Sequence, residues 1–498
     1  MRRLLIALGI AATLILSGCA TVENPVTGKN ERTVMDEKSE MAEGAKAHPQ
    51  ILAEFGEYKN PAMQAYVNDV GQRLAKASHR PELDWHFTVL DSPDVNAFAL
   101  PGGYVYVTRG IMAYMNSEAD LAGVIGHEIG HVTARHGSQR ATRQQTAGIG
   151  VIAATLLGVA LESRGVRGAA NAASQASQGV AAGYVAKYNR GQESQADKLG
   201  AEYLSRLNYD PHNMVDVIKV LESQERFAAD QARAEGGTPR QGGSDWLASH
   251  PSNELRLREI TEIANGYKPQ ASYTDEGRDR YLQVMDGVAF GESSAQGVTR
   301  GRNFYHEPLG IALTAPPGWK IQNSADALFL VNGEGNAALT LKSVPPQAGS
   351  THEEIIRNAV KPSSGKMEKR TLNGLPATHF TGTVQDQNGQ SQTVELTLVT
   401  GPSNTNFAFI YGAKDQQSLQ RAYPQIQQAE SSFRPITAED RTAAREWKLK
   451  TVPLPSGGLA ELAKQSPLTT NAEQQLRLLN GVYGGGEEKP GQLVKVVA

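Results

Sequence analysis

The sequence predicts a multidomain α+β protein, with a mainly helical domain that carries a small β-sheet, a small α+β domain and a strand–helix–helix–strand tail. The chain has 498 residues, and at about 150 residues per domain this length corresponds to roughly three domains. Helical spacing of apolar residues dominates the first part of the chain, whereas alternating β-rich runs dominate residues 309–434. Hydrophobic residues form 40% of the chain, which supplies packed cores and excludes a mostly disordered protein.

The charge and the cysteine content exclude several classes of protein. The net charge is −3, so there is no basic excess to neutralise a phosphate backbone, and no nucleic-acid partner is predicted. Cys19 is the only cysteine of the sequence. Internal disulfides, thiolate zinc sites and a cysteine nucleophile in the body of the protein are therefore excluded.

The start of the chain has the pattern of an export signal. Two arginines precede a short apolar run, and small residues follow it. The string Leu16-Ser17-Gly18-Cys19 resembles the lipobox of bacterial lipoproteins, in which the cysteine becomes the lipidated N-terminus. Residues 1–19 are therefore predicted to be a lipoprotein signal peptide and Cys19 the lipidation site, with an ordinary signal peptide as the alternative. Ala20, in place of an aspartate, favours an outer-membrane anchor that faces the periplasm.

The next segments of the chain are a tether and the start of the principal domain. Residues 20–60 are polar and are predicted to form a tether with one short helix. Residues 61–265 are predicted to form the principal domain. Its first element is a helix over Pro61–Ser78, because the apolar residues there recur at helical spacing and a proline stands at the start.

Extended segments and a second helix follow within this domain. Trp85–Val107 contains alternating and β-rich runs, which predict strands. Ser117, with Asp120 three residues later, predicts the N-terminus of a helix that ends near His136.

Two smaller units are predicted after a linker over residues 266–299. Residues 300–435 are predicted to form a small α+β domain, in which Pro316-Pro317-Gly318-Trp319 resembles the photosystem-associated PsbP-like modules. Residues 447–498 are predicted to form a βααβ tail. Its last part is similar to the closing half of a LysM repeat, a module that binds N-acetylglucosamine glycans such as peptidoglycan. The opening segment lacks the usual Gly-Asp-Thr, so a purely structural tail is the alternative.

The string His127-Glu128-Ile129-Gly130-His131 carries the clearest chemistry of the sequence. Two histidines four residues apart project from one face of a helix and bind one zinc ion, with the glutamate between them as the general base. Only about 0.02 matches are expected by chance in a chain of this length. The surrounding helix is apolar, and polar groups in such a helix are paired or bind a metal.

A catalytic zinc needs a third protein ligand, and the segment from residue 189 to 197 supplies the best candidate. Glu193 and Asp197 stand four residues apart at the start of an apolar helical stripe. Glu193 is predicted to be the third zinc ligand, and Asp197 is predicted to orient a ligand histidine through a hydrogen bond. The alternative is an exposed acidic helix start. His136 lies five residues after His131, off the ligand face of a continuous helix, and is interpreted as a structural or surface residue.

These two motifs together resemble the CAAX-prenyl-endopeptidase-like zinc metallopeptidases, peptidase family M48, and especially their periplasmic quality-control branch. Further matching stretches begin at Asn24, Asn96 and Ser249, so the resemblance covers about residues 24–265. It implies a zincin-type peptidase domain that contains Zn²⁺. Branch members with a helical-repeat tail differ from this sequence, which shows no such repeat.

The resemblance implies the chemistry of a zinc endopeptidase. Zinc held by His127, His131 and Glu193 polarises the scissile carbonyl, and Glu128 transfers a proton from the attacking water to the leaving amine. An edge strand near residue 100 is expected to pair with the backbone of an extended, unfolded substrate. The expected substrate-binding residues are Asn96, Ala97, Phe98, Ala99, Pro101, Gly102 and Gly103.

His250 is a further candidate, in the string Ser249-His250-Pro251. It is expected either to stabilise the oxyanion or to occupy the open zinc position and keep the enzyme latent. A surface loop histidine is the alternative.

The favoured function is a zinc endopeptidase of the bacterial envelope that hydrolyses misfolded or stalled periplasmic and outer-membrane proteins. The alternatives are a zinc-bearing assembly chaperone for outer-membrane proteins with little proteolysis, and a scaffold linked to peptidoglycan. The intact Glu128 favours the peptidase, because a chaperone does not need a general base.

Overall fold

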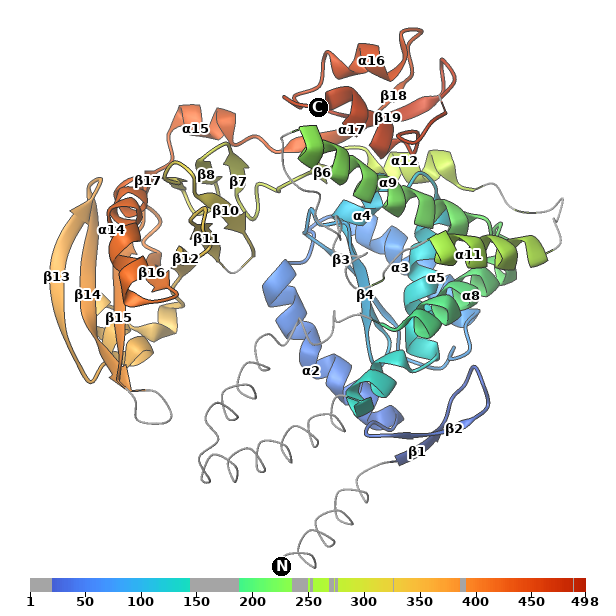
Figure 1. The fold of residues 1–498 in the computed structure, drawn as a ribbon, viewed down its shortest axis with the longest axis horizontal. Helices are drawn as coiled ribbons and strands as arrows, with labels where there is room; N and C mark the ends of the chain where they lie inside the picture. The colour runs from blue at the N-terminus through green and yellow to red at the C-terminus, as the bar shows by residue number, and fades with distance from the viewer. Residues whose placement is uncertain are drawn as a thin grey trace, which may run out of the picture. The chain divides into compact units, whose positions relative to one another are not determined.

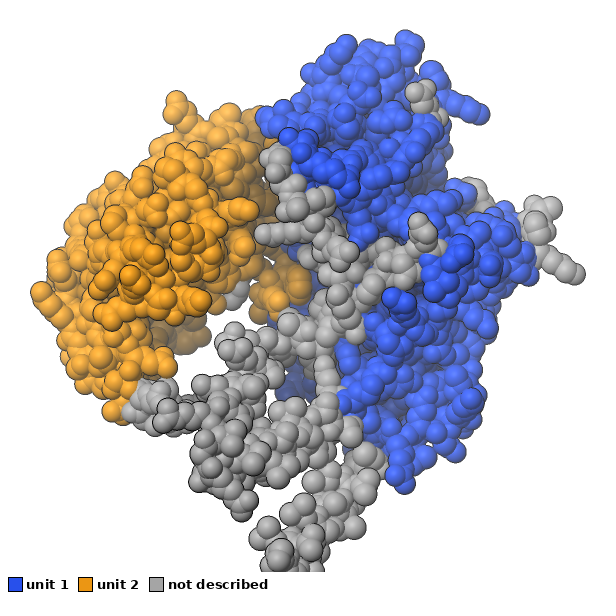
Figure 2. Space-filling model, in the orientation of Figure 1, with its two compact units in different colours: residues 1–52, 56–288, 448–498 blue, residues 53–55, 289–447 orange. Residues whose placement is uncertain are grey.

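The computed structural model describes residues 20–143, 188–234, 250, 254–267, 273, 276–325, 327–385, 391–486 and 488–498. The chain divides into two compact units (Figures 1 and 2). Unit 1 comprises residues 1–52, 56–288 and 448–498, and unit 2 comprises residues 53–55 and 289–447. The expected signal peptide and Cys19 lie outside the described residues. Within the described part of the chain, no helix has the length and apolar character needed to span a bilayer.

The elements of unit 1 that carry the later argument are helices around one small sheet (Figure 1). The helices are α2 (Glu37–Phe55), α3 (Pro61–Lys76), α4 (Arg109–Tyr114), α5 (Glu118–Thr133), α8 (Arg190–Arg206), α9 (Asn213–Ala234), α11 (Glu254–Gly266) and α12 (Arg278–Met285). The strands are β1 (Ala20–Glu23), β2 (Asn30–Thr33), β3 (His86–Leu90), β4 (Ala97–Leu100) and β5 (Tyr104–Thr108).

The sheet of unit 1 has the strand order β3-β5-β4. β3 runs parallel to β5, and β4 runs antiparallel to β5, with Ala97 opposite Val107 and Leu100 opposite Tyr104. β4 is therefore an edge strand. Gly102 and Gly103 form the turn between β4 and β5 with φ of +85° and +97°, a backbone conformation that favours glycine.

Helix α5 is the central element of unit 1, and every one of its residues is buried. The Ser117 side chain accepts a hydrogen bond from the Asp120 backbone N–H, which caps the helix as the sequence predicts. α3 also begins at Pro61, where the Asn60 side chain accepts from the Met63 N–H. Both predicted helices are thus present, and α5 ends three residues earlier than expected.

Residues 20–60 are not a tether. β1 and β2 pair as an antiparallel hairpin, and α2 extends over 19 residues. Glu40 of this helix is buried and lies 3.0 Å from Arg80 Nη1 and 3.1 Å from Arg135 Nη2. The composition of the segment concealed this packing, because the buried face of α2 consists of Glu40, Gly44, Ala47 and Ile51, a charged residue and two small ones with a single large apolar side chain.

The tail has the predicted order of elements, namely β18 (Trp447–Pro453), α16 (Gly458–Ala463), α17 (Ala472–Leu479) and β19 (Leu493–Val497). β18 and β19 pair antiparallel. Residues 448–498 belong to unit 1, so the described chain has two compact units where the sequence predicts three domains. Lys495 connects the tail to α4, because its buried Nζ donates hydrogen bonds to the carbonyls of Ala113 and Met115, both at 2.6 Å.

Unit 2 is built on a seven-stranded sheet with the order β10-β11-β12-β16-β15-β14-β13. These strands are β10 (Lys320–Asn323), β11 (Leu328–Val331), β12 (Ala337–Ser343), β13 (Ser364–Leu372), β14 (Leu375–Gln385), β15 (Ser391–Thr400) and β16 (Asn406–Ala413). A smaller sheet has the order β17-β9-β8-β7, from β7 (Val298–Arg300), β8 (Asn303–His306), β9 (Ile311–Thr314) and β17 (Arg434–Pro435).

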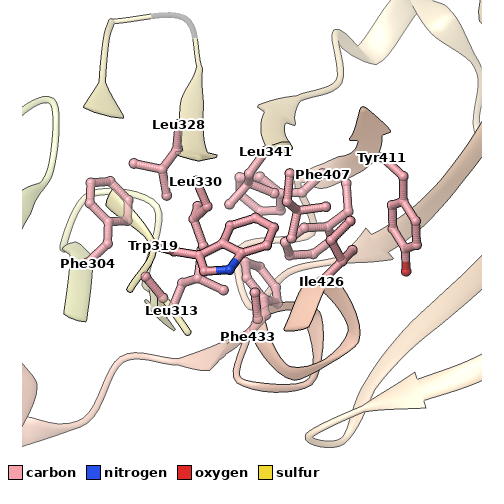
Figure 3. Close-up of a cluster of buried hydrophobic side chains, with 14 of the residues drawn as sticks. Phe304, Leu313, Trp319, Leu328, Leu330, Leu341, Phe407, Tyr411, Ile426 and Phe433 are labelled. Atoms are coloured by element: carbon pink, nitrogen blue, oxygen red, sulfur yellow. The ribbon is translucent and has the colours of Figure 1, made fainter. Parts of the chain in front are cut away.

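Unit 2 has hydrophobic clusters on both faces of its larger sheet. On one face, α14 (Gln416–Ser431) contributes Ile426 to a cluster with Trp319 and Phe433 (Figure 3). On the other face, α13 (His352–Ile355) and the helical turn η3 (Ile356–Val360) cover Phe380 of β14. The predicted α+β composition of this region is present. The segment predicted as a linker over residues 266–299 contains α12 and β7, so the ordered structure begins earlier than expected.

The buried contact of Lys495 generates a prediction about stability. Lys495→Met removes both hydrogen bonds and leaves two buried carbonyls unpaired, at a cost of roughly 1–3 kcal/mol for each carbonyl. Burial lowers the pKa of Lys495 well below its ordinary value, so the unfolded chain binds this proton over a pH range in which the folded protein does not. In this pH range the free energy of unfolding of the wild type therefore increases with pH. The variant has no titrating group at this position and lacks this increase.

Urea unfolding of both proteins at pH 7 and pH 9 measures this effect, and the exposed Lys489→Met is the matched control. The stability difference between wild type and Lys495→Met is expected to grow with pH. A Lys495→Met midpoint equal to that of the control at both pH values would contradict the assignment.

Candidate metal centre

Close packing of α5 on α8 positions the site. A Cβ placed on Gly126 would meet Gly200 Cα at 3.4 Å, and one on Gly130 would meet the Ala196 carbonyl at 3.0 Å. A Cβ on Gly200 would in turn meet the His127 backbone N at 3.2 Å. Small residues four apart on both helices therefore allow the two backbones to approach. This approach brings the side chains of α8 within reach of the histidines of α5.

The N-terminal cap of α8 sets where this helix begins, and so where its acidic residues lie along it. The Asn189 side chain accepts from the Gln192 N–H at 3.0 Å, and the Gln192 side chain accepts from the Asn189 N–H at 3.3 Å, which completes a capping box. Glu193 and Asp197 follow in the first two turns of the helix and are buried. The exposed acidic helix start, considered as the alternative from the sequence, is therefore wrong.

Four buried side chains meet between α5, α8 and the segment that carries His250. They are His127, His131, Glu193 and His250, and one donor atom from each lies within 4.8 Å of the other three. The two Nε2 atoms of His127 and His131 are 3.0 Å apart. The Glu193 carboxylate lies 3.7 Å from the first of these atoms and 3.4 Å from the second.

The hydrogen bonds around these histidines favour a cation between them. His127 Nδ1 lies 2.8 Å from Asp197 Oδ1, and His131 Nδ1 lies 2.9 Å from His136 Nδ1. When both Nδ1 atoms carry the proton, both Nε2 atoms present lone pairs to the same point, beside an anionic carboxylate. Nitrogen and carboxylate donors of this kind suit zinc, so the residues fit the metal.

Arg256 of α11 balances the negative charge of the site. It binds Asp197 in a bidentate manner, with Nε at 2.7 Å and Nη2 at 2.8 Å, and its Nη1 lies 3.1 Å from Glu193. Burial alone would raise the pKa of both carboxyl groups. For Asp197 the charge and hydrogen bonds of Arg256 outweigh burial and lower the pKa, and for Glu193 the neighbouring His250 and Arg256 do so. Both groups are therefore ionised.

His250 lies inside the cluster. Its Nδ1 is 3.0 Å from Glu193 Oε1 and 3.2 Å from His127 Nε2, and its Nε2 is 3.6 Å from Glu128 Oε1. The surface-loop alternative is therefore wrong, because only 1% of His250 is exposed. Glu128 is also fully buried, one residue after His127. The structure thus brings the expected base, the three expected ligands and His250 together.

The expected substrate-binding strand lies next to the metal cluster. Ala99, Leu100 and Pro101 line a small cavity of about 10 Å³ together with His131 and Tyr188. The strand residues Ala97 and Phe98 lie on the edge strand β4, and Asn96 precedes it. Gly102 and Gly103 have a structural role that the sequence did not reveal, because a Cβ on Gly102 would meet Met41 Cα of α2 at 2.6 Å.

Sequence reasoning missed two residues that contact the centre. Arg256 stands in a charged helix without a motif, and its burial was the missing information. Tyr188 stacks on the His131 ring with a centroid distance of 3.8 Å. The surface interpretation of His136 is also wrong, since it is buried and bonded to His131. Burial lowers the pKa of His136 to about 4.

Comparison with known proteins agrees with this geometry. Residues 61–264 match the model of Peptidase family M48. The match covers less than half of the chain, so the segment is similar to this family of metallopeptidases. Its cofactor is zinc, and the buried cluster of His127, His131, Glu193 and His250 is able to bind the ion.

The matched segment is also similar to curated bacterial and mitochondrial proteins. The "Beta-barrel assembly-enhancing protease" of Yersinia pestis is 28% identical over 256 residues, which cover 51% of this chain and 49% of the relative. The protein of the same name from Escherichia coli is 29% identical and covers 45% and 43% of the two chains. The "Mitochondrial metalloendopeptidase OMA1" of Schizosaccharomyces pombe is 29% identical and covers 50% and 66%. The chain thus spans about half the length of the bacterial relatives.

A solved structure is also weakly similar to the chain. Cyanobacterial PsbP from Synechocystis is 12% identical, with a TM-score of 0.21, and the match covers 28% of this chain and 98% of that chain. A TM-score this low does not show a shared fold. The PsbP-like and LysM-like interpretations of the later units therefore stay predictions.

The packing of α5 on α8 generates a prediction about zinc binding. Gly200→Val places a branched side chain against the His127 backbone, and overpacking of this kind costs roughly 1–3 kcal/mol. The helices move apart, so the variant is expected to bind zinc more weakly than the wild type. Gly266→Val is the matched control, since a Cβ at Gly266 meets nothing within 4 Å. Competition with a chromophoric chelator measures the affinity, and equal values for the two variants would refute the packing argument.

Proposed function

We propose that the chain is a zinc-dependent endopeptidase of the bacterial cell envelope that hydrolyses misfolded or stalled periplasmic and outer-membrane proteins. The observation that carries the proposal is the position of Glu128. It is buried on α5 between the ligands His127 and His131, with Oε1 3.6 Å from His250 Nε2. A site that only stored or displayed zinc would not require a carboxylate at this position.

The chemistry of the proposal divides between zinc and the chain. Zinc, when bound, polarises the scissile carbonyl and acidifies the attacking water. Glu128 accepts the proton of that water and delivers it to the leaving amine. Asp197 holds His127 with its Nε2 toward the metal position, and Arg256 prevents the two carboxylates of α8 from repelling each other. Burial of the whole cluster excludes bulk water and strengthens these interactions.

The edge strand β4 is the reason for proposing an unfolded substrate. β4 has one side paired with β5, and its other backbone edge is not paired within the described sheet. An extended polypeptide adds to such an edge through backbone hydrogen bonds, which depend little on sequence. Ala99–Pro101 share a cavity with His131, so a strand bound there would pass close to the metal. Pairing of this kind selects unfolded segments over folded proteins.

We further propose that His250 keeps the enzyme latent. Its Nδ1 lies against Glu193 and His127 Nε2, at the place that a substrate carbonyl or water needs. Arg256 Nη1 donates to the His250 carbonyl at 3.1 Å, which holds the residue in position. To stabilise the oxyanion, His250 would have to lie beside the metal ligands without binding the metal itself. The short contacts with two ligands favour the latent role.

The cellular location is part of the proposal. The predicted lipoprotein signal peptide and lipidation at Cys19 would anchor the protein to the outer membrane, facing the periplasm. Two relatives carry the name "Beta-barrel assembly-enhancing protease", which agrees with substrates among envelope proteins. Binding of the tail to peptidoglycan is a weaker proposal, because the contacts of Lys495 give the tail a structural role within unit 1. The chaperone and scaffold alternatives do not account for Glu128.

The first test of the proposal replaces the base. Glu128→Gln keeps the size of the side chain and removes its ability to accept a proton, so casein degradation is expected to fall by at least about 100-fold. Zinc content is expected to stay at the wild-type level, because the ligands are intact. Wild-type protein with and without a chelator is the control. Degradation by the variant at the wild-type rate would defeat the proposal in favour of the chaperone.

A second test addresses His250. In the latent arrangement, His250→Ala opens the metal position, so casein degradation is expected to increase while zinc affinity decreases. In the oxyanion arrangement, kcat decreases and zinc affinity does not change. Measuring both quantities separates the two roles. Unchanged values of both would eliminate any functional role for this histidine.

A further inference from the structure

The most informative group outside the described mechanism is the partner of His131. His131 Nε2 faces His127 Nε2 and Glu193, and its Nδ1 lies 2.9 Å from His136 Nδ1. His136 Nε2 in turn lies 3.0 Å from Gln195 Oε1, on α8. His136 is fully buried. A continuous chain of contacts thus runs from a metal ligand of α5 through His136 to the helix that carries Glu193.

The protons on this chain have one consistent arrangement. A histidine that binds metal through Nε2 carries its proton on Nδ1, so His131 must donate to His136 Nδ1. His136 Nδ1 is then an acceptor, and the His136 proton is on Nε2. That N–H donates to the Gln195 amide oxygen, which only accepts. Every donor in the chain therefore meets an acceptor.

The turn after α5 aims His136 at His131. The helix ends at Thr133, and Arg135 has a φ of 58°, in the left-handed region that residues with a Cβ rarely adopt. A residue five positions after His131 would point off the ligand face of a continuous helix. The left-handed residue changes the direction of the chain, and His136 lies against the ring of His131.

The two ligand histidines on α5 have partners of different charge. His127 faces the carboxylate of Asp197, whereas His131 faces a neutral imidazole. Around the donor atoms, three carboxylates are balanced by Arg256 and the two charges of zinc. A second anionic partner would leave this buried site with an uncompensated negative charge, which is costly in a low dielectric.

We propose that His136 is a positioning residue for the metal centre: as a neutral hydrogen-bond acceptor anchored by Gln195, it fixes the tautomer and the ring orientation of His131. It does not touch the substrate. Its contribution is to the affinity for zinc and to the alignment of the ligand beside Glu128.

The test uses two replacements in the full-length protein that differ in one property. His136→Asn places an amide oxygen where Nδ1 stands and retains a neutral acceptor for His131, but loses the contact with Gln195. His136→Leu has a similar shape and no acceptor. Zinc affinity is measured by chelator competition without substrate, so the result does not depend on whether the protein is a peptidase.

We expect His136→Leu to bind zinc about 10 to 100 times more weakly than wild type, and His136→Asn to stay within about threefold of wild type, since the acceptor is retained. Thermal unfolding of the metal-free proteins identifies any loss of fold. A purely structural role predicts equal losses for both variants, because both lose the contact with Gln195. Equal zinc affinities of the two variants, whether reduced or unchanged, would overturn the proposal.

The ¹⁵N shifts of His131 in the zinc-loaded His136→Asn variant should show the wild-type tautomer. The other tautomer would also overturn the proposal.

Discussion

The close approach of α5 and α8 is the constraint on which the metal centre depends. Glutamate and aspartate have short side chains, so Glu193 and Asp197 reach the histidines only if the two helix backbones nearly touch. Gly126 and Gly130 on one helix, with Ala196 and Gly200 on the other, remove the side chains that would keep them apart. The glycine inside the metal motif therefore belongs to the packing, whereas the flanking histidines belong to the chemistry.

The second requirement is charge balance in a buried site. Two carboxylates one helical turn apart repel each other when water is excluded, and burial raises the pKa of each. Arg256 changes this outcome, because it binds Asp197 with two nitrogens and Glu193 with a third. The lowered pKa of Asp197 follows chiefly from this guanidinium, and that of Glu193 from His250 together with it. α11 thus contributes none of the four clustered donor side chains, yet the charge state of the carboxylates on α8 depends on it.

The sequence predicted those features that depend only on residues close together in the chain, within a single helix or strand. The cap at Ser117, the start of α3 at Pro61 and the βααβ order of the tail all follow from short stretches of sequence. The sequence could not predict Arg256, because an arginine among charged neighbours in a helix is usually exposed. It could not predict the stacking of Tyr188 on His131 either, because the two residues lie far apart in the sequence. In these cases the deciding information is the tertiary neighbour.

The N-terminal segment shows how far such tertiary information extends. A left-handed backbone at a residue with a Cβ costs roughly 1–2 kcal/mol, so something must hold Arg135 in place. Glu40 of α2 does so, together with the Met35 carbonyl, which accepts from Arg135 Nη2 at 2.8 Å. Arg80 shares the same carboxylate. The segment that resembles a tether in the sequence therefore stabilises the turn that directs His136 to His131. A polar stretch near an N-terminus is no evidence of a linker when its charges have buried partners elsewhere in the fold.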